Sequence, residues 1–306
     1  MWEVGTSFRL LRSGRPSPVH RSWLEQVRPR VAAAGLDRGW LAETVPPAGF
    51  VPDLVNPLPV GPAPTPAAEF AALLTVPAEL VRRDLDRVEA EQGRLGPRLR
   101  ALRADPAAHL PRLVKEVETY WELALAPYWA RIRAVLEADV FHRARQVAEH
   151  GVREVFNDLH ATVRWDANTL RLEGRTRSLP RAEAGTGLLL IPSAFAAQLL
   201  TRALPAEPLQ IAYAARGLGA LWEPRPVAPT AALAAVLGRG RTLLLAELAT
   251  PASTTELARR TGCSAPGVSQ QLTALRAAGL VSAHRVGRSV LYARTAAAET
   301  LLAAAG

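Results

Sequence analysis

The sequence predicts a mainly helical α+β protein. A large helical N-terminal domain with a small sheet is followed by a C-terminal winged helix-turn-helix. Between residues 69 and 160, apolar side chains recur three and four residues apart, which is the spacing of an amphipathic helix. Short apolar runs with strand character follow. The last quarter of the chain has the order helix, tight turn, helix and two basic strands, which is the layout of a winged helix-turn-helix.

Length and composition bound the class of protein. The chain has 306 residues, is 49% hydrophobic and 21% charged, and is an ordinary globular protein with room for two domains. The formal net charge is +9, and residues 231–306 hold eight arginines against three glutamates. This concentration of positive charge is typical of a phosphate-binding surface, although net charge alone also fits a merely soluble basic face.

The cysteine content and the apolar runs indicate a cytoplasmic protein without a membrane segment. With Cys263 as the single cysteine, no disulfide can form within the chain, which agrees with a reducing compartment. The first residues contain no apolar stretch like that of a signal peptide. The longest apolar run, residues 187–200, is too short to span a bilayer and is interrupted by Pro192.

Two proline-rich stretches divide the chain. Residues 45–66 cannot form a helix interior, because proline lacks the N–H and clashes with the preceding turn, so we expect a loop or an extended strap. Residues 222–230 are the expected boundary between an N-terminal domain of residues 1–225 and a winged helix-turn-helix domain of residues 226–306.

Within the first domain the helical spacing is strongest over residues 107–160, where Pro127 should begin or kink a helix. A hairpin is expected next, with strands at residues 161–165 and 169–174 around a turn at residues 166–168. Two further short strands are expected, at residues 187–195 and 209–217.

The first half of the helix-turn-helix has clear start and stop signals. Residues 241–248 should form its supporting helix. Ser253 and Glu256 have the spacing of a capping box, in which the serine hydroxyl accepts the Glu256 amide and the glutamate reaches back. The next helix should cover residues 254–261 and end at Gly262, where a left-handed backbone costs glycine little.

The second helix of the motif is expected to be capped by Ser264, with Pro266 tolerated in its first turn. Val268, Leu272 and Leu275 share its buried face. The opposite face is small and polar, which suits insertion between base edges, where a glutamine amide can pair with adenine. The residues of this helix that we expect to contact DNA are Ser264, Pro266, Gly267, Ser269, Gln270, Gln271, Thr273 and Arg276.

A basic wing should follow. Strands at residues 280–285 and 288–294 surround a two-residue turn, and Arg285 and Arg288 near its tip are expected to contact backbone phosphate or the minor groove. Thr295 then caps a last alanine-rich helix.

The segment from residue 238 to residue 292 resembles the ArsR/SmtB family of bacterial winged-helix regulators. The resemblance is carried by Arg241, Leu244 and Leu248, by the run ELARRTGCSAPGVSQQLTALRAAGLV, and by the wing VGRSVLY. One departure is Gln271, where the family usually has histidine. The resemblance implies a homodimeric repressor that an inducer releases from its operator. The first 225 residues resemble the long N-terminal region, of unassigned function, of a group of actinobacterial ArsR-like regulators.

The resemblance does not imply metal sensing. The arsenic-type sensors of the family carry paired cysteines at the start of the first motif helix, where this chain has STTELA. The zinc-type sensors use Asp and His on the last helix, where this chain has AAAETLLAAAG. Cys263 stands alone, and we expect a small buried filler. His142 and His150 lie eight residues apart, too far for joint chelation from one helix. We therefore expect no metal site.

Aromatic residues repeat eight positions apart in the helical region, as Tyr120-Trp121 and Tyr128-Trp129. They could line a pocket for an apolar or aromatic effector. The alternative, which we favour, is that they are core. The isolated glycine pairs lack the lysine or third glycine of a nucleotide site, and Ser193 lacks the flanking glycines of a nucleophile elbow. We therefore expect neither catalytic residues nor a cofactor.

Together these patterns predict a sequence-specific regulator of transcription. We expect a repressor that binds double-stranded DNA as a homodimer and responds to a non-metal signal. The alternative is a regulatory protein that uses its winged helix for protein–protein contacts.

Overall fold

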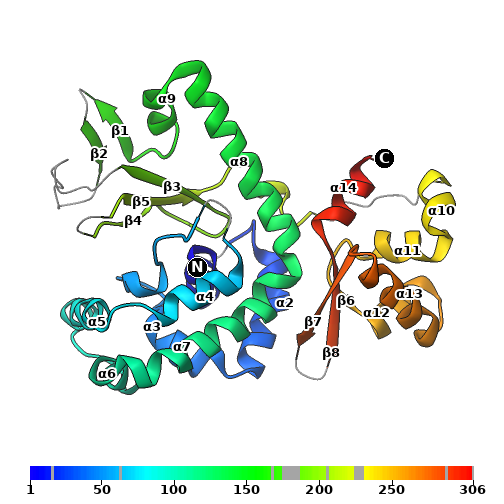
Figure 1. The fold of residues 1–306 in the computed structure, drawn as a ribbon, viewed down its shortest axis with the longest axis horizontal. Helices are drawn as coiled ribbons and strands as arrows, with labels where there is room; N and C mark the ends of the chain where they lie inside the picture. Colours follow the sequence, from blue (N-terminus) through cyan, green and yellow to red (C-terminus); the bar gives the residue numbers. More distant parts are fainter. Residues whose placement is uncertain are drawn as a thin grey trace. The chain divides into compact units, whose positions relative to one another are not determined.

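The computed structural model describes residues 1–14, 17–61, 64–166, 169–173, 187–204, 207–223, 231–286 and 289–304 (Figure 1). The fold is mainly helical with small sheets, as predicted. The chain forms two compact units, each built from separate stretches of sequence. The first unit comprises Met1–Arg15, Arg38–Lys115 and Val135–Leu218, and the second, the winged-helix unit, comprises Pro16–Asp37, Glu116–Ala134 and Gly219–Gly306. The expected boundary near residue 225 lies outside the described residues and stays a prediction.

Helices of the first unit begin and end at local signals. Thr65 caps α4 by accepting the Ala68 amide, the Asp105 carboxylate accepts the Ala108 amide at the start of α7, and α5 ends at Gly93 with φ 80°. The elements are α1 (Trp2–Arg12), η1 (Leu36–Arg38), α3 (Trp40–Thr44), η2 (Asp53–Val55), α4 (Pro66–Leu74), α5 (Ala78–Gln92), α6 (Pro97–Ala104), α7 (Pro106–Tyr120), α8 (Trp129–His150) and α9 (Val152–Asn157). Four elements have residues in both units, namely η1, α7, α8 and η5 (Leu218–Ala220).

Two small sheets complete the first unit. The predicted hairpin is confirmed: β1 (Val163–Asp166) pairs antiparallel with β2 (Thr169–Leu172), and the middle of its turn, residues 167–168, lies outside the described part. The second sheet has the order β3 (Leu188–Ser193), β5 (Leu209–Ala214), β4 (Leu200–Arg202), with β3 parallel and β4 antiparallel to β5. The strand β4 was not predicted, because three residues are too short to show a period.

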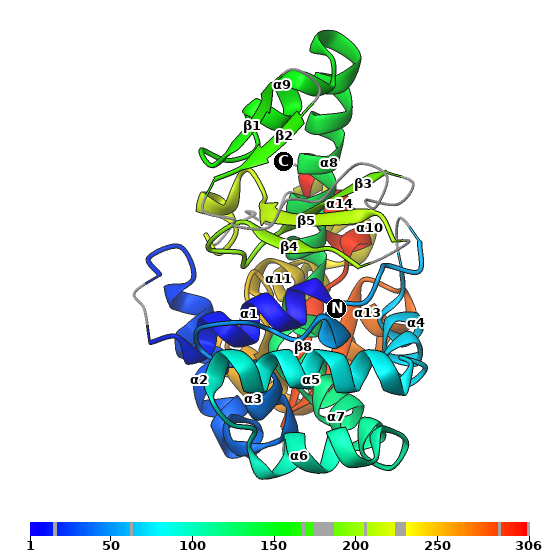
Figure 2. The same cartoon turned by 90° about the vertical axis from the view of Figure 1, so that its left-hand side faces the viewer.

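The N-terminal helix α1 is almost wholly buried beside this second sheet (Figure 2). Polar side chains on α1 meet the end of β3: the Glu3 carboxylate accepts the Ala194 amide at 3.1 Å, and Thr6 Oγ1 lies 3.2 Å from Ser193 Oγ. Burial raises the pKa of Glu3 to about 7, although hydrogen bonds from Ser193 and Ala194 act in the opposite direction. The sequence did not reveal this helix as core, because its inward face is partly polar.

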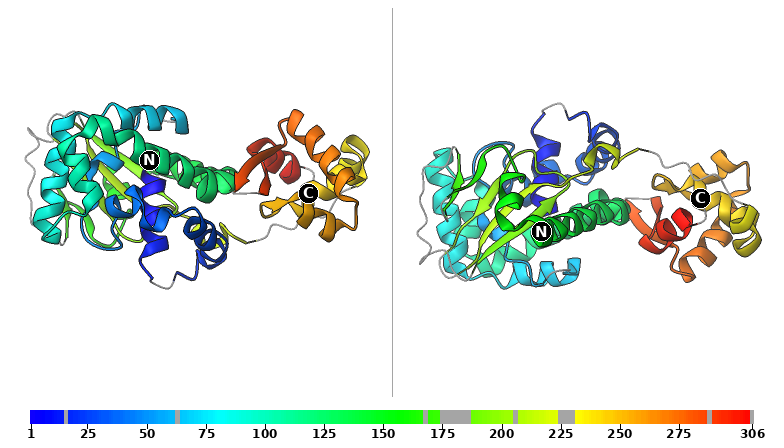
Figure 3. Two further views of the ribbon diagram at one scale, coloured as in Figure 1. Left: turned by 90° about the horizontal axis from the view of Figure 1, so that it is seen from below. Right: turned by 90° about the horizontal axis from the view of Figure 1, so that it is seen from above.

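A break interrupts the long helical region at the position where Pro127 was expected to begin or kink a helix. Between α7 and α8 the backbone forms a π turn, η3 (Trp121–Leu125), and a 3-10 turn, η4 (Ala126–Tyr128), with Pro127 in its first turn. Proline cannot donate the helical hydrogen bond, so the chain changes its winding there. Beyond the break, α8 continues as one helix to His150 (Figure 3).

The winged-helix unit contains the C-terminal elements together with α2 and the break. Its elements are α2 (Arg21–Ala33), η3, η4, η5 (Leu218–Ala220), α10 (Ala231–Leu237), α11 (Arg239–Glu247), β6 (Ala252–Ser253), α12 (Thr254–Thr261), α13 (Ala265–Ala277), β7 (Val281–Val286), β8 (Ser289–Arg294) and α14 (Ala296–Ala304). The strands have the order β6-β8-β7, all antiparallel. No helix in the described ranges has the length and apolar character needed to cross a bilayer.

We expect Glu3→Gln to flatten the pH dependence of stability. A carboxyl whose pKa is higher in the folded state binds its proton more tightly there, so its contribution to stability is present at low pH and is lost as the pH rises from 4.5 through about 7. At 1.36 kcal/mol per pKa unit, the free energy of unfolding of the wild type should fall by up to about 3 kcal/mol more than that of the variant between about pH 5 and pH 8.

Urea denaturation at several pH values across this range measures the difference. The exposed Glu79→Gln is the matched control and should follow the wild type. Parallel curves for Glu3→Gln and the wild type would contradict the expectation.

Candidate nucleic-acid interface

The two helices of the motif are held in place by the predicted caps. Ser253 Oγ accepts the Glu256 amide at 3.2 Å, α12 ends at Gly262 with φ 68°, and Ser264 Oγ accepts the Gly267 amide at the start of α13. The reciprocal half of the capping box does not form in the described structure. The Glu256 carboxylate instead accepts hydrogen bonds from Arg259 and Arg260, at 2.8 Å each, and these bonds lower its pKa to about 2.

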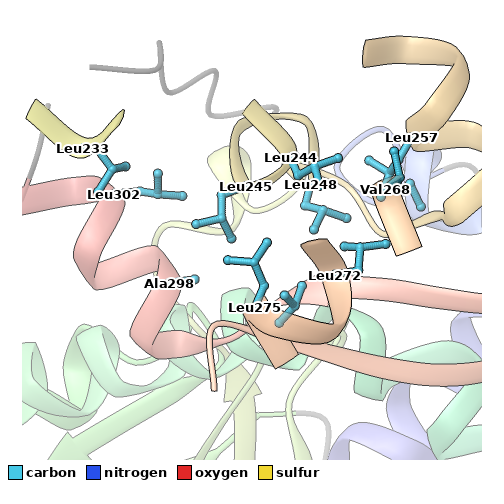
Figure 4. Packing of buried hydrophobic residues seen from close by; sticks show 12 residues of the cluster. Leu233, Leu244, Leu245, Leu248, Leu257, Val268, Leu272, Leu275, Ala298 and Leu302 are labelled. Atoms are coloured by element: carbon cyan, nitrogen blue, oxygen red, sulfur yellow. The ribbon is translucent and has the colours of Figure 1, made fainter. Parts of the chain in front are cut away.

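One face of α13 is packed into the core of the winged-helix unit (Figure 4). Val268, Leu272 and Leu275 are each at most 1% exposed, as the helical spacing predicted. Their neighbours come from α10, α11, α12 and α14 and include Leu233, Leu244, Leu245, Leu248, Leu257, Ala298 and Leu302. Burial of three consecutive turns fixes the rotation of α13 about its own axis.

The opposite face of α13 is exposed, small and polar. The exposed residues are Ser264, Pro266, Ser269, Gln270, Thr273 and Arg276, while Gly267 is half-buried. The Thr273 hydroxyl donates to the Ser269 carbonyl at 2.9 Å, which leaves its oxygen lone pairs and its methyl group to face outward. Gln270 makes no side-chain hydrogen bond within the described chain, so its donor and acceptor are both available.

Gln271 lies differently from its neighbour Gln270. Its half-buried amide packs over Gly240 of α11, so closely that a methyl group built on Gly240 would lie 2.6 Å from Gln271 Oε1. The side chain therefore contacts the supporting helix, and the expected contact of Gln271 with DNA stays a prediction.

The wing forms as predicted, with Arg285 exposed on β7 opposite Val290 of β8. Arg288 lies outside the described residues. The two arginines near the end of α12 differ in exposure. The side chain of Arg259 is 73% exposed and that of Arg260 is 32% exposed, and both form ion pairs with Glu256. Arg276 is also exposed.

Cys263 is exposed, and our expectation of a buried filler was wrong. The turn between α12 and α13 directs its side chain outward, with the sulfur 3.8 Å from the Thr261 carbonyl. The hydrophobic positions of the motif are filled by its leucines and Val268, which leaves the turn at the surface.

Arg294 is a buried residue that holds the motif together and that the sequence did not single out. It is 4% exposed, and its guanidinium donates to the carbonyls of Leu245 at 2.6 Å and Ala246 at 2.7 Å, in the last turn of α11. Its third nitrogen lies 3.5 Å from Glu299 of α14. The last carbonyls of a helix have no partner within the helix, and Arg294 supplies one. Burial lowers the pKa of this guanidinium.

The wing also packs on the break between α7 and α8. His284 Nδ1 lies 3.3 Å from the Glu122 carboxylate, and its other ring nitrogen lies 2.8 Å from Ser282 Oγ. Arg131, just after the break, lies 3.9 Å from Glu299, the same carboxylate that Arg294 approaches. The winged helix and the break therefore share charged contacts.

The aromatic residues of the candidate ligand pocket lie at this break. Tyr120, Trp121 and Tyr128 are buried and Trp129 is half-buried, and the two tryptophan rings meet edge to face with centroids 4.8 Å apart. Tyr128 donates to Gln26 at 3.0 Å and its ring contacts Trp222. These contacts agree with the alternative that the aromatics are core, and an effector pocket stays a prediction.

Among the described residues, no group of three or more His, Cys, Asp or Glu side chains is arranged to hold a metal ion. His142 and His150 are both exposed on α8.

Two helices joined by a tight turn, an outward polar face on the second helix and a three-stranded sheet that ends in a hairpin define a winged helix-turn-helix. The protein-family model described as "Bacterial regulatory protein, arsR family" matches residues 242–283, which run from α11 into β7. This C-terminal segment is an ArsR-family helix-turn-helix, an element of DNA-binding transcription regulators, in a chain with a large N-terminal region. Comparisons with curated proteins and with solved structures found no match.

We expect Arg294→Leu to destabilise the winged-helix unit by about 2–4 kcal/mol, because the Leu245 and Ala246 carbonyls lose their guanidinium donor and the Glu299 carboxylate loses the nearer of its two arginines. Urea denaturation measures the change. The exposed Arg276→Leu is the control and should stay within about 0.5 kcal/mol of the wild type. Equal effects of the two substitutions would show that the hydrogen bonds from Arg294 to α11 contribute nothing to the free energy of unfolding.

Proposed function

We propose that the protein is a sequence-specific DNA-binding regulator of transcription that reads base edges with α13. The observation that supports this most strongly is that α13 has a buried apolar face and, opposite it, an exposed polar face. The buried face of Val268, Leu272 and Leu275 sets the rotation, and the opposite face presents uncharged polar groups suited to base edges.

In this proposal the residues divide into two roles. Ser269, Gln270 and Thr273 face the bases of the major groove, while the amides at the start of α13, near Ser264, face a phosphate. The exposed arginines Arg276 and Arg285, together with Arg288, which the sequence predicts near the tip of the wing, neutralise phosphates without reading sequence. Contacts of α13 with bases therefore set the sequence specificity, and contacts of the arginines with phosphates set the position of the protein on the DNA.

We further propose a repressor that binds a pseudo-palindromic operator as a homodimer, through a domain that begins near residue 226. The ArsR-family match supports the regulator class. A twofold protein places two recognition helices one turn of DNA apart, which requires an operator with the same symmetry.

The alternative function is a winged helix that docks a protein partner. The exposed polar face and basic margins favour DNA, because protein interfaces usually have an apolar centre with few charges. Selection of binding sequences from random duplexes, followed by gel shift on DNA upstream of the gene, separates the two. Failure to enrich any sequence, with no shift at low salt, would overturn the DNA proposal.

We expect Gln270→Ala to weaken operator binding by about 1–3 kcal/mol while it leaves binding to random DNA unchanged, since a base contact is lost but no phosphate contact. Gel shift on the selected operator and on a scrambled duplex measures both affinities. Arg285→Ala is the matched comparison and should weaken both complexes equally and reduce the salt slope by about one. Equal losses on both duplexes for Gln270→Ala would remove its base-reading role.

The signal is proposed to be a small apolar or aromatic molecule that acts at the break between α7 and α8. The break carries four aromatic side chains and contacts the wing through Glu122 and His284. Helices α7 and α8, which flank the break, each have residues in both units.

We expect an effector to quench tryptophan fluorescence saturably, because Trp121 and Trp129 are in mutual contact at the break. Titration of a compound library against the intact protein measures this. Trp129→Phe should lose most of the response and Trp40→Phe, in α3, should keep it. A library without a saturable binder, or a response that survives Trp129→Phe, would contradict an effector at the break.

A further inference from the structure

The C-terminal half of α8 exposes large apolar side chains. Phe141 is 72% exposed, Val140 54% and Val147 40%. The other face of the helix is firmly attached to the first unit: buried Asp139 accepts from the Tyr213 hydroxyl, and buried Arg143 donates to Asp158 at 2.7 Å. The direction of the exposed face is therefore fixed by contacts on the opposite side of the same helix.

The residues on this exposed face are arranged symmetrically about Phe141. Positions at equal distances before and after Phe141 match as follows: Ala138 with Ala144, Ala134 with Ala148, Glu137 with Arg145, and Arg133 with Glu149. All eight are exposed. At 100° per residue, Ala134, Glu137, Phe141, Arg145 and Ala148 fall within one narrow stripe. Each alanine on one side of Phe141 thus has an alanine at the same distance on the other side, and each charged residue has a residue of opposite charge.

This pattern is complementary to itself in one orientation only. If two α8 helices lie antiparallel with a twofold axis beside Phe141, Glu137 of one copy faces the partner's Arg145, and Arg145 faces the partner's Glu137. In a parallel pair each charge would instead face its own kind, which is unfavourable. The alanines leave room for two helices to approach closely, and the exposed phenylalanine rings meet at the centre.

We propose that this face of α8, the α8 stripe, is a self-association surface whose occupant is the α8 stripe of a second copy of the chain in antiparallel orientation. The inference rests on the proposed homodimeric function and specifies its interface. It removes the exposed Phe141 side chain from water in each copy and places opposite charges around it. The interface lies outside the winged helix-turn-helix motif.

The first test is sedimentation equilibrium of the full-length protein without DNA. Phe141→Asp should raise the dissociation constant of the dimer at least about 100-fold, because it places two carboxylates at the centre of the pair. Val236→Asp is the matched control: Val236 is an exposed valine, 80% accessible, on α10 of the winged-helix unit. A dimer that survives Phe141→Asp would overturn the proposal, and so would a wild type that stays monomeric.

The second test uses the charges and is independent of any loss of folding. Glu137→Arg alone and Arg145→Glu alone should each weaken self-association about 10-fold, because like charges then face each other twice. An equimolar mixture of the two variants should form a heterodimer as tight as the wild-type dimer, since every facing pair is again of opposite sign. Two weakened variants that fail to rescue each other would overturn the antiparallel pairing.

Gel shift on the selected operator keeps the two proposals apart. Loss of DNA binding with an intact dimer contradicts the proposed function alone, whereas an intact DNA complex with no contribution of the α8 stripe to dimerisation contradicts this inference alone.

Discussion

The rotation of α13 about its own axis is the constraint on which the proposed interface depends. Val268, Leu272 and Leu275 are buried on successive turns against leucines of α11 and α12, so the helix cannot turn without exposing them. The orientation of Ser269, Gln270 and Thr273 follows from that burial. Side chains that read base edges need to be held by rigid packing behind them, and the fully buried residues of the cluster behind α13 are all aliphatic.

Arg294 fixes the position of the sheet relative to the helices of the motif. One buried guanidinium joins β8 to the last carbonyls of α11 and to Glu299 on α14, so that strand, supporting helix and C-terminal helix share one polar contact. A helix end that is buried leaves carbonyls that water cannot reach, and a fork-shaped donor with several N–H groups suits this position better than a lysine would. The same glutamate lies near Arg131, which links the winged helix to the break in the long helical region.

The break and the α8 stripe lie on one helical region and give it two distinct roles. Near Pro127 the winding changes to a π turn and a 3-10 turn, and this part contacts the wing. Beyond it, α8 is a regular helix with an exposed face centred on Phe141. The break directly precedes the helix that carries the stripe.

Local signals made much of the C-terminal unit predictable. Ser253, Gly262 and Ser264 set helix ends through hydrogen bonds and backbone conformations that span four residues or fewer, and the apolar spacing around Leu272 indicates the buried face directly. Pro127 likewise marks the break because its effect is confined to one turn. In contrast, the eight arginines of residues 231–306 look alike in sequence, and nothing local distinguishes buried Arg294 from exposed Arg285.

The sequence by itself therefore determined the order of the elements in the winged helix-turn-helix, the caps at Ser253 and Ser264, and the polar face of α13. The tertiary structure alone decided which side chains meet across long stretches of chain. It placed Glu3 against Ala194, 191 residues away, put Gln271 on α11 beside Gly240, and left Cys263 at the surface. The physical reason is that caps and periodicity depend on neighbours within one or two turns. Burial and the pKa of a side chain depend instead on whatever distant segment the fold brings alongside it.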